Sequence, residues 1–253
     1  METTWRLVIQ YDGGRYCGWQ EQPNGDSIQA RVRTALSSVL GGARPVLIAS
    51  GRTDSGVHAL GQVCSFRTDL VRGARSVRDG MNSHLPEDIG VLLAEPAHPR
   101  FHAQRSATGK LYRYRLRVGS GRPALRSGRI LQTRYALDVP AMQQALSILV
   151  GRHDFTSFRA AGCSAHSPVR TLNSALLREV EDELWIELHG QGFLRHMVRN
   201  IVGSLIEVGR GRRAPGWFRE LLDQEDRKQA GRTAPACGLY LVRVDYPSEL
   251  LRS

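Results

Sequence analysis

The segment Lys110–Val118 reads KLYRYRLRV and alternates strictly between two kinds of side chain. Apolar or aromatic residues occupy positions 112, 114, 116 and 118, and arginines occupy positions 113, 115 and 117. Because successive side chains of a strand point to opposite faces, this pattern predicts a half-buried β-strand. The pattern alone leaves open whether Tyr112 is only a packing residue or a surface on which an RNA base stacks, a contact worth about 1–3 kcal/mol.

Further strands and helices are expected on both sides of this segment. Period-2 patterns predict strands at residues 5–11, 45–49, 61–67, 90–97 and 238–246, and a hairpin over residues 174–190 that turns at 181–183. Helical spacing of apolar residues predicts helices at residues 28–40, 140–150 and 193–209. Strands and helices recur in mixed order and no linker divides the chain, so we expect an α+β protein with two mixed α/β halves, residues 1–110 and 111–253.

The charge balance favours a polyanionic partner. The 253 residues include 35 Lys and Arg against 24 Asp and Glu, a net charge of +11, and only Lys110 and Lys228 are lysines. Codon bias explains the replacement of lysine by arginine but leaves the net charge unexplained. Arginine binds phosphate oxygens in pairs and stacks on bases, so nucleic acid is the partner that fits best.

Several classes of protein are excluded because their residues are missing. No apolar run is long enough to span a membrane and the first residues, METTWRLVIQYD, do not resemble a leader, so a cytoplasmic protein is expected. The four cysteines are far apart and suit reduced thiols. The chain lacks GxxxxGK[ST], GxGxxG, HExxH and GxSxG motifs, so a reaction without cofactor or metal fits best.

A second segment, SGRTDSGVHALGQVCSF at residues 50–66, places polar residues between two glycines and immediately before a predicted strand. Glycines permit backbone conformations that hold a loop in a fixed shape, here with Arg52 and Asp54 on display. A carboxylate beside an arginine stays ionised and can act as a nucleophile or a base. The alternative is a loop salt bridge with no catalytic role.

Three short basic clusters could form a track for an RNA backbone, although each alone is typical of a solvated face. They are Arg72, Arg75 and Arg78; Arg122, Arg126 and Arg129; and Arg210, Arg212 and Arg213.

The chain resembles the TruA family of tRNA pseudouridine synthases. The resemblance lies in SGRTDSGVHALGQVCSF together with YDGGRYCGWQ, RSATGKLYRYRL, GRHDFTSF, GQGFLRHMVRNIVGSLIEVGRG and PACGLYL, which follow the family's order over nearly the whole chain. It implies the pseudouridine synthase fold, in which two α/β halves with largely antiparallel sheets meet at a basic active-site cleft. It also implies a homodimer that isomerises uridines 38, 39 and 40 of the tRNA anticodon arm without metal or cofactor.

The resemblance assigns roles to five residues. Asp54 matches the catalytic aspartate, and Arg199 matches the basic residue that pairs with it. Tyr112 matches the tyrosine that stacks on the target base, and Leu239 an apolar residue beside that base. Arg52 matches an arginine that helps to flip out the nucleotide.

Three hypotheses follow, and the sequence leaves the catalytic step open. The first is a synthase acting on the anticodon arm, in which Asp54 attacks the sugar carbon or removes the neighbouring sugar proton. The alternatives are a non-catalytic RNA-binding protein and a pseudouridine synthase with another RNA target.

Overall fold

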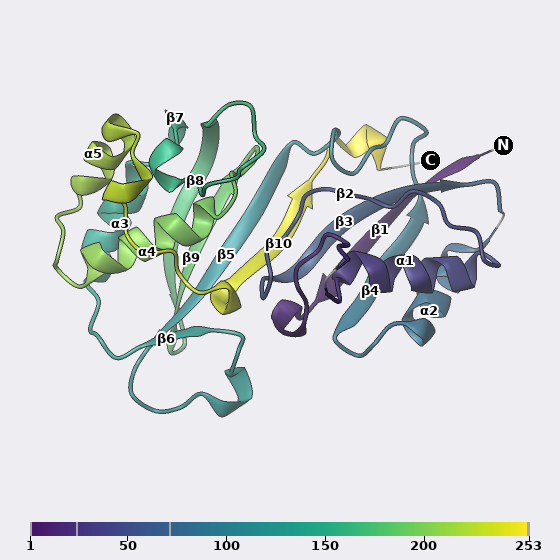
Figure 1. Ribbon diagram of the computed structural model, residues 1–253, viewed down its shortest axis with the longest axis horizontal. Coiled ribbons are helices and arrows are strands. Elements are labelled where there is room, and N and C mark those ends of the chain that lie inside the picture. The colour runs from purple at the N-terminus through teal and green to yellow at the C-terminus, as the bar shows by residue number, and fades with distance from the viewer. Residues whose placement is uncertain (1, 24, 71, 252–253) are drawn as a thin grey trace. The chain divides into compact units, whose positions relative to one another are not determined.

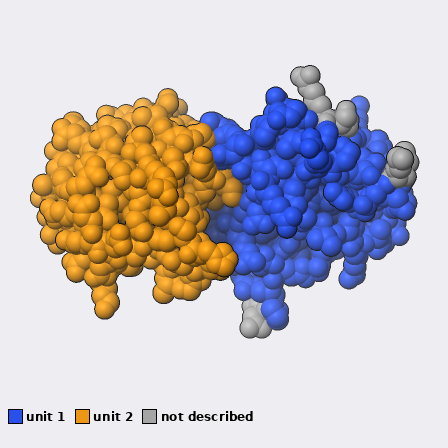
Figure 2. Space-filling model, turned by 90° about the horizontal axis from the view of Figure 1, so that it is seen from above, with its two compact units in different colours: residues 1–109, 240–253 blue, residues 110–239 orange. Residues whose placement is uncertain are grey.

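A computed structural model describes residues 2–23, 25–70 and 72–251, and the chain divides into two compact units (Figure 2). Unit 1 comprises residues 1–109 and 240–253, and unit 2 comprises residues 110–239. The first boundary lies within one residue of the expected one. Residues 240–253, which we expected in the second half, belong instead to unit 1, because β10 (Leu239–Asp245) pairs in parallel with β3 (His58–Thr68).

Unit 1 is an α/β layer in which two helices cover one face of a sheet (Figure 1). The other elements are β1 (Thr3–Tyr11), α1 (Ile28–Val39), β2 (Ile48–Ala49), α2 (Ala74–His84) and β4 (Ile89–Pro96). The strand order is β4-β1-β3-β10, with β2 also on β3, and every pair except β3–β10 is antiparallel. Ser27 caps α1 by accepting a hydrogen bond from the Ala30 amide.

Unit 2 has the same kind of architecture with three helices against its sheet (Figure 1). Its elements are β5 (Gly109–Val118), β6 (Leu131–Thr133), α3 (Val139–Ser147), β7 (Gly151–Asp154), β8 (Val169–Val180), β9 (Glu183–Gly190), α4 (Met197–Gly209) and α5 (Trp217–Gln224). The order β5-β9-β8-β7 is antiparallel throughout, and β6 adds to β5 in parallel. The expected fold class, mixed α/β with largely antiparallel sheets, is confirmed in each unit.

The alternation of KLYRYRLRV is confirmed in β5. Tyr114 and Leu116 are fully buried on one face. On the other face each arginine meets a carboxylate of the β8–β9 hairpin: Arg113 bonds Glu187, Arg115 bonds Glu183 and Arg117 bonds Asp182, at 2.8, 2.7 and 2.6 Å. The outer face of this strand is therefore an ion-pair network rather than a row of unpaired arginines.

Glu183 is the most buried carboxylate of this network, and it should govern stability in acid. Burial alone would raise its pKa, but hydrogen bonds from Arg115, Trp185 and Arg126 outweigh burial and lower the pKa from 4.5 to about 2. A carboxylate whose pKa is lowered by folding stabilises the protein above its unfolded pKa, and that contribution is lost as the pH falls from 4.5 towards 2. The shift corresponds to about 3 kcal/mol at neutral pH.

We therefore expect Glu183→Gln to lower the free energy of unfolding at pH 7 by about 3 kcal/mol and to flatten its decline between pH 4.5 and 2. Urea unfolding at a series of pH values measures both effects. Glu179→Gln, on an exposed residue of β8, is the matched control. Parallel stability curves for wild type and Glu183→Gln would contradict this account of the network.

Three expected elements are shorter than predicted, and two helices were not predicted. The helix expected at 140–150 ends at Ser147. The strand expected at 45–49 is reduced to Ile48–Ala49. The helix expected at 193–209 begins at Met197, because His196 has a left-handed backbone (φ 59°) and the Arg195 carbonyl accepts a hydrogen bond from the Ala160 amide. Arg195 therefore lies outside the helix that carries Arg199. Helices α2 and α5 were missed; α2 buries only Val77 and Met81 of its own residues, which gives a weak periodic signal.

Candidate active site

The loop that carries Asp54 is held in unit 1 by contacts at both of its ends. On the β2 side, Gln62 is fully buried and donates to the Gly51 carbonyl at 2.9 Å while its side-chain oxygen accepts from Ser50 at 2.7 Å. On the β3 side, the Val57 amide donates to the Asp54 carbonyl at 3.1 Å, and Gly56 takes the positive φ of 77° that this turn requires.

The segment YDGGRYCGWQ packs directly against this loop. The Trp19 amide donates to the Thr53 carbonyl at 3.0 Å, and the Tyr11 hydroxyl lies 2.8 Å from the Thr53 hydroxyl. A side chain at Gly18, which has a φ of 109°, would come within 2.8 Å of that same carbonyl. The glycines of the two segments thus allow two backbones to meet, and buried Thr53 anchors the loop between its two charged neighbours.

Arg52 and Asp54, on either side of Thr53 in this loop, differ in their exposure to solvent. Arg52 is exposed and Asp54 is half-buried. The buried residues Thr53 and Gln62 fix the backbone of the loop on both sides of these two charged residues.

Tyr112 lies near the start of β5 in unit 2, where it is 9% exposed. Its ring meets the ring of Phe193 edge-on, with centroids 4.9 Å apart and planes at 77°. Such a contact fixes the orientation of a ring. Lys110 is two residues away on the same face of the strand, and burial lowers its pKa to about 8. The sequence analysis did not single out Lys110, and its position in the alternating pattern was the signal that could have found it.

Arg199 lies on α4, and a neighbouring segment holds its guanidinium group. The Arg199 side chain donates to the Ala234 carbonyl at 2.8 Å, and the Ala234 amide donates to the Arg199 carbonyl at 3.0 Å. Next to it, fully buried Asn200 accepts from Thr233 at 2.6 Å and donates to the Phe158 carbonyl at 2.8 Å. Asn200 was missed by the sequence analysis although it follows Arg199 directly.

The same segment continues to Leu239 and passes Tyr114. The Tyr114 hydroxyl donates to the Pro235 carbonyl at 2.8 Å, and a side chain at Gly238 would lie 2.7 Å from the Tyr114 ring. Burial of this hydroxyl raises the pKa of Tyr114. Leu239, 5% exposed, follows immediately at the start of β10. Residues 233–239 therefore contact both the helix of Arg199 and the strand of Tyr112. This one segment of unit 2 links three of the predicted site residues, Arg199, Tyr112 and Leu239.

The predicted site residues thus fall into two groups. Arg52 and Asp54 belong to the anchored loop of unit 1, and Tyr112, Arg199 and Leu239 belong to unit 2. Within the described residues, no group of three or more His, Cys, Asp or Glu side chains could hold a metal ion. No helix in the described ranges is long and apolar enough to cross a membrane.

Comparison with known proteins gives the family. A family model described as tRNA pseudouridine synthase matches residues 7–104 and 145–247. The tRNA pseudouridine synthase A of Photobacterium profundum is 45% identical over 96% of this chain and 93% of the relative. That of Syntrophotalea carbinolica is 46% identical over 95% of each, and that of Neisseria gonorrhoeae is 45% identical over 96% of this chain and 92% of the relative.

These matches cover nearly the whole chain at a level that unrelated proteins do not reach. The protein is therefore an isomerase that modifies RNA. It belongs to the tRNA pseudouridine synthase family and converts uridine to pseudouridine in tRNA.

Proposed function

We propose that Asp54 is the catalytic residue and that the target uridines are positions 38, 39 and 40 of the tRNA anticodon arm. The observation that carries the assignment of Asp54 is its place in a loop whose backbone is locked on both sides by buried partners. A catalytic group must be held in one geometry, and a locked loop provides this.

The reaction breaks the bond between uracil N1 and the sugar C1′, turns the released uracil, and joins its C5 to C1′. The hydrogen on C5 then leaves as a proton. Asp54 either attacks the sugar carbon, which gives a covalent intermediate, or removes the neighbouring sugar proton, which gives a glycal. In both routes the uracil has to be retained while it is detached.

The other four residues serve that requirement. Tyr112 stacks on the uracil, supported by its edge-on contact with Phe193. Leu239 provides an apolar wall that excludes water. Arg199, its guanidinium held by the Ala234 carbonyl, pairs with the Asp54 carboxylate and orients it. Exposed Arg52 binds the backbone of the flipped nucleotide.

The role of Tyr112 predicts a difference between two substitutions. Tyr112→Phe keeps an aromatic face and should retain most activity, whereas Tyr112→Leu should lower kcat/KM by about 10- to 100-fold through loss of about 1–3 kcal/mol of stacking. Initial rates of pseudouridine formation on tRNA transcripts measure this, with circular dichroism to verify folding. Equal rates for the two variants would show that Tyr112 is only a packing residue.

The proposed positions are tested by mapping. Tritium release from transcripts labelled at uridine C5 reports turnover, and chemical mapping of pseudouridine then locates the modified positions. Pseudouridine at 38, 39 and 40 alone supports the proposal, and pseudouridine elsewhere assigns the protein another target.

We also propose that the protein works as a homodimer in the cytoplasm. The resemblance to the family supports the dimer, and four free cysteines suit a reducing compartment. Analytical ultracentrifugation tests the oligomeric state, since a species of one chain's mass, 28.1 kDa, at micromolar concentration would contradict it.

A further inference from the structure

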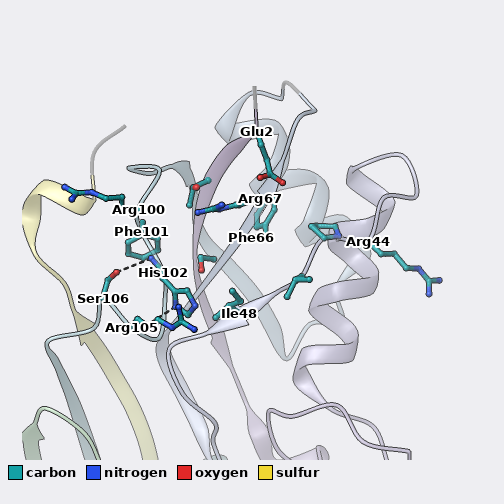
Figure 3. A pocket seen from close by; sticks show the side chains of 14 residues that line it. Glu2, Arg44, Ile48, Phe66, Arg67, Arg100, Phe101, His102, Arg105 and Ser106 are labelled. Carbon is teal, nitrogen blue, oxygen red and sulfur yellow. Dashed lines mark hydrogen bonds between the residues drawn. The ribbon is translucent and has the colours of Figure 1, made fainter.

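Unit 1 contains a pocket of about 800 Å³ that none of the proposed catalytic residues lines (Figure 3). It lies between the start of β1, the connection from α1 to β2, the far end of β3 and the loop at residues 100–106. Its size is within the range of binding sites for small molecules or for single groups of a polymer. Among the residues that the structure describes, its lining is distinctly basic, since it contains Arg44, Arg67, Arg100, Arg105 and His102 and one carboxylate, Glu2.

The loop at residues 100–106 is a fixed part of this pocket. Phe101 and Ala103 anchor it in the core, at 2% and 0% exposure, and the Ala103 amide donates to the Ser65 hydroxyl at 3.0 Å. The His102 Nδ1 accepts from the amides of Gln104 and Arg105 at 3.2 and 3.1 Å. Because Nδ1 is an acceptor, the ring proton is on Nε2, which remains a donor.

The arginines of the pocket differ from those of the basic clusters in the sequence. Arg75 and Arg78 pair with Asp79, Arg126 pairs with Asp182 and Glu183, and Arg210 and Arg212 pair with Glu207. Among the residues that the structure describes, no carboxylate pairs with the four pocket arginines, which are 44, 67, 100 and 105. The pocket therefore concentrates positive charge from three separate parts of the sequence, namely Arg44, Arg67 and the loop that carries Arg100 and Arg105.

Among the four pocket arginines, Arg67 has its guanidinium group held by a hydrogen bond. It donates to the Pro99 carbonyl at 3.0 Å, so the end of β3 is fixed next to the loop that carries Arg100 and Arg105. Arg44 and Arg100 instead extend outward on opposite sides of the pocket (Figure 3). The positive charge thus continues past the pocket in two directions, which suits a chain of phosphates better than one compact anion.

The two phenylalanine rings of the pocket are not available for stacking on bases. Phe66 and Phe101 are each only 2% exposed, and Phe66 stacks on Trp5 with centroids 6.0 Å apart. Bases are recognised by stacking or by their edges, whereas phosphates are bound by arginine without regard to sequence. We propose that this pocket binds the phosphate backbone of the tRNA substrate at a second place, away from the target uridine.

The length of β3 supports a position of the pocket away from the target uridine. Asp54 lies four residues before His58 at one end of the strand, and Arg67 lies at the other end. Nine residues of strand span about 30 Å. An RNA that reaches both the Asp54 loop and the pocket must therefore extend well beyond the nucleotide that reacts. This step rests on the proposed function, because it takes Asp54 as the residue at the reacting nucleotide.

The test removes two pocket charges, in Arg67→Gln/Arg105→Gln, and measures binding and turnover with two RNAs. With whole tRNA we expect Kd to rise about 10-fold at ~50 mM salt and the slope of log K against log salt to become shallower by about 2. Single-turnover rates at saturating tRNA should not change. A short RNA of the anticodon stem and loop should bind both proteins equally.

The matched control is Arg31→Gln/Arg33→Gln, which removes the same charge from two arginines of α1 that pair with Asp26 and Glu21. If the pocket variant resembled this control with whole tRNA, the pocket would not be an RNA site. If the pocket variant lost as much affinity for the short RNA as for whole tRNA, the pocket would contact RNA next to the target uridine. That result would overturn the proposal of a contact away from the target. These Kd values do not depend on turnover, so a wild type that modified other uridines would refute only the proposed targets.

Discussion

Asp54→Asn is expected to bind tRNA with unchanged affinity and to form pseudouridine at least about 10⁴-fold more slowly than the wild type. An amide has nearly the shape of a carboxylate, but it is neither a nucleophile at the sugar carbon nor a base for the sugar proton. Loss of a group that carries the covalent or proton-transfer step typically costs this much or more. Single-turnover tritium release and a tRNA-binding titration measure the two quantities separately.

Asp69→Asn, on an exposed aspartate of the same unit, is the control for loss of one negative charge. It should leave both quantities unchanged. A rate for Asp54→Asn within about 10-fold of the wild type would assign the chemistry to another residue, because a neutral amide does not sustain either route.

Gly203→Ala is expected to have the largest effect on stability. A methyl group at Gly203 would overlap the Arg232 carbonyl oxygen and lie 3.3 Å from the Ala234 amide. These are backbone atoms, which do not move aside as the end of a flexible side chain does, so we expect a loss of about 3 kcal/mol or more. Urea unfolding measures the loss.

The same substitution should also affect activity in the molecules that stay folded. Displacing residues 232–234 from α4 removes the carbonyl that holds the Arg199 guanidinium. We expect kcat to fall while tRNA affinity is retained. Gly216→Ala is the control, since a side chain there meets no atom within 4 Å. A stable and fully active Gly203→Ala variant would show that the segment 231–234 is free to shift without cost.

The sequence predicted the elements with strong local periodicity and the residues with a recognisable motif. The strict alternation of Lys110–Val118 reports local geometry, and the structure confirms the strand there. Helix α2 gave no clear pattern, because only two of its residues are buried. The start of α4 depends on a hydrogen bond from Ala160, thirty-five residues before Arg195, and no local pattern reveals such a contact.

The proposed site also combines features that a local sequence motif reveals with features that depend on distant segments. Motifs indicated Asp54 and Tyr112, but the groups that hold the site residues in place come from distant segments. Ala234 holds Arg199 across thirty-five positions of sequence, and Pro235 accepts from Tyr114 across a still larger separation. The clusters of arginine in the sequence did not by themselves identify unpaired positive charge. Arginines that are close in sequence are largely paired with carboxylates in the structure.

The return of the last strand to unit 1 has a consequence for the protein during its synthesis. Val244 and Tyr246 pack against the core around Phe101, and the Tyr246 hydroxyl donates to the Ala103 carbonyl at 2.6 Å. Unit 2 is one continuous stretch of chain, whereas unit 1 lacks β10 until residues 240–245 leave the ribosome. The sheet of the N-terminal unit, although translated first, is therefore completed only after all of unit 2 has been made, and until then the nascent chain carries the Asp54 loop on an unfinished sheet.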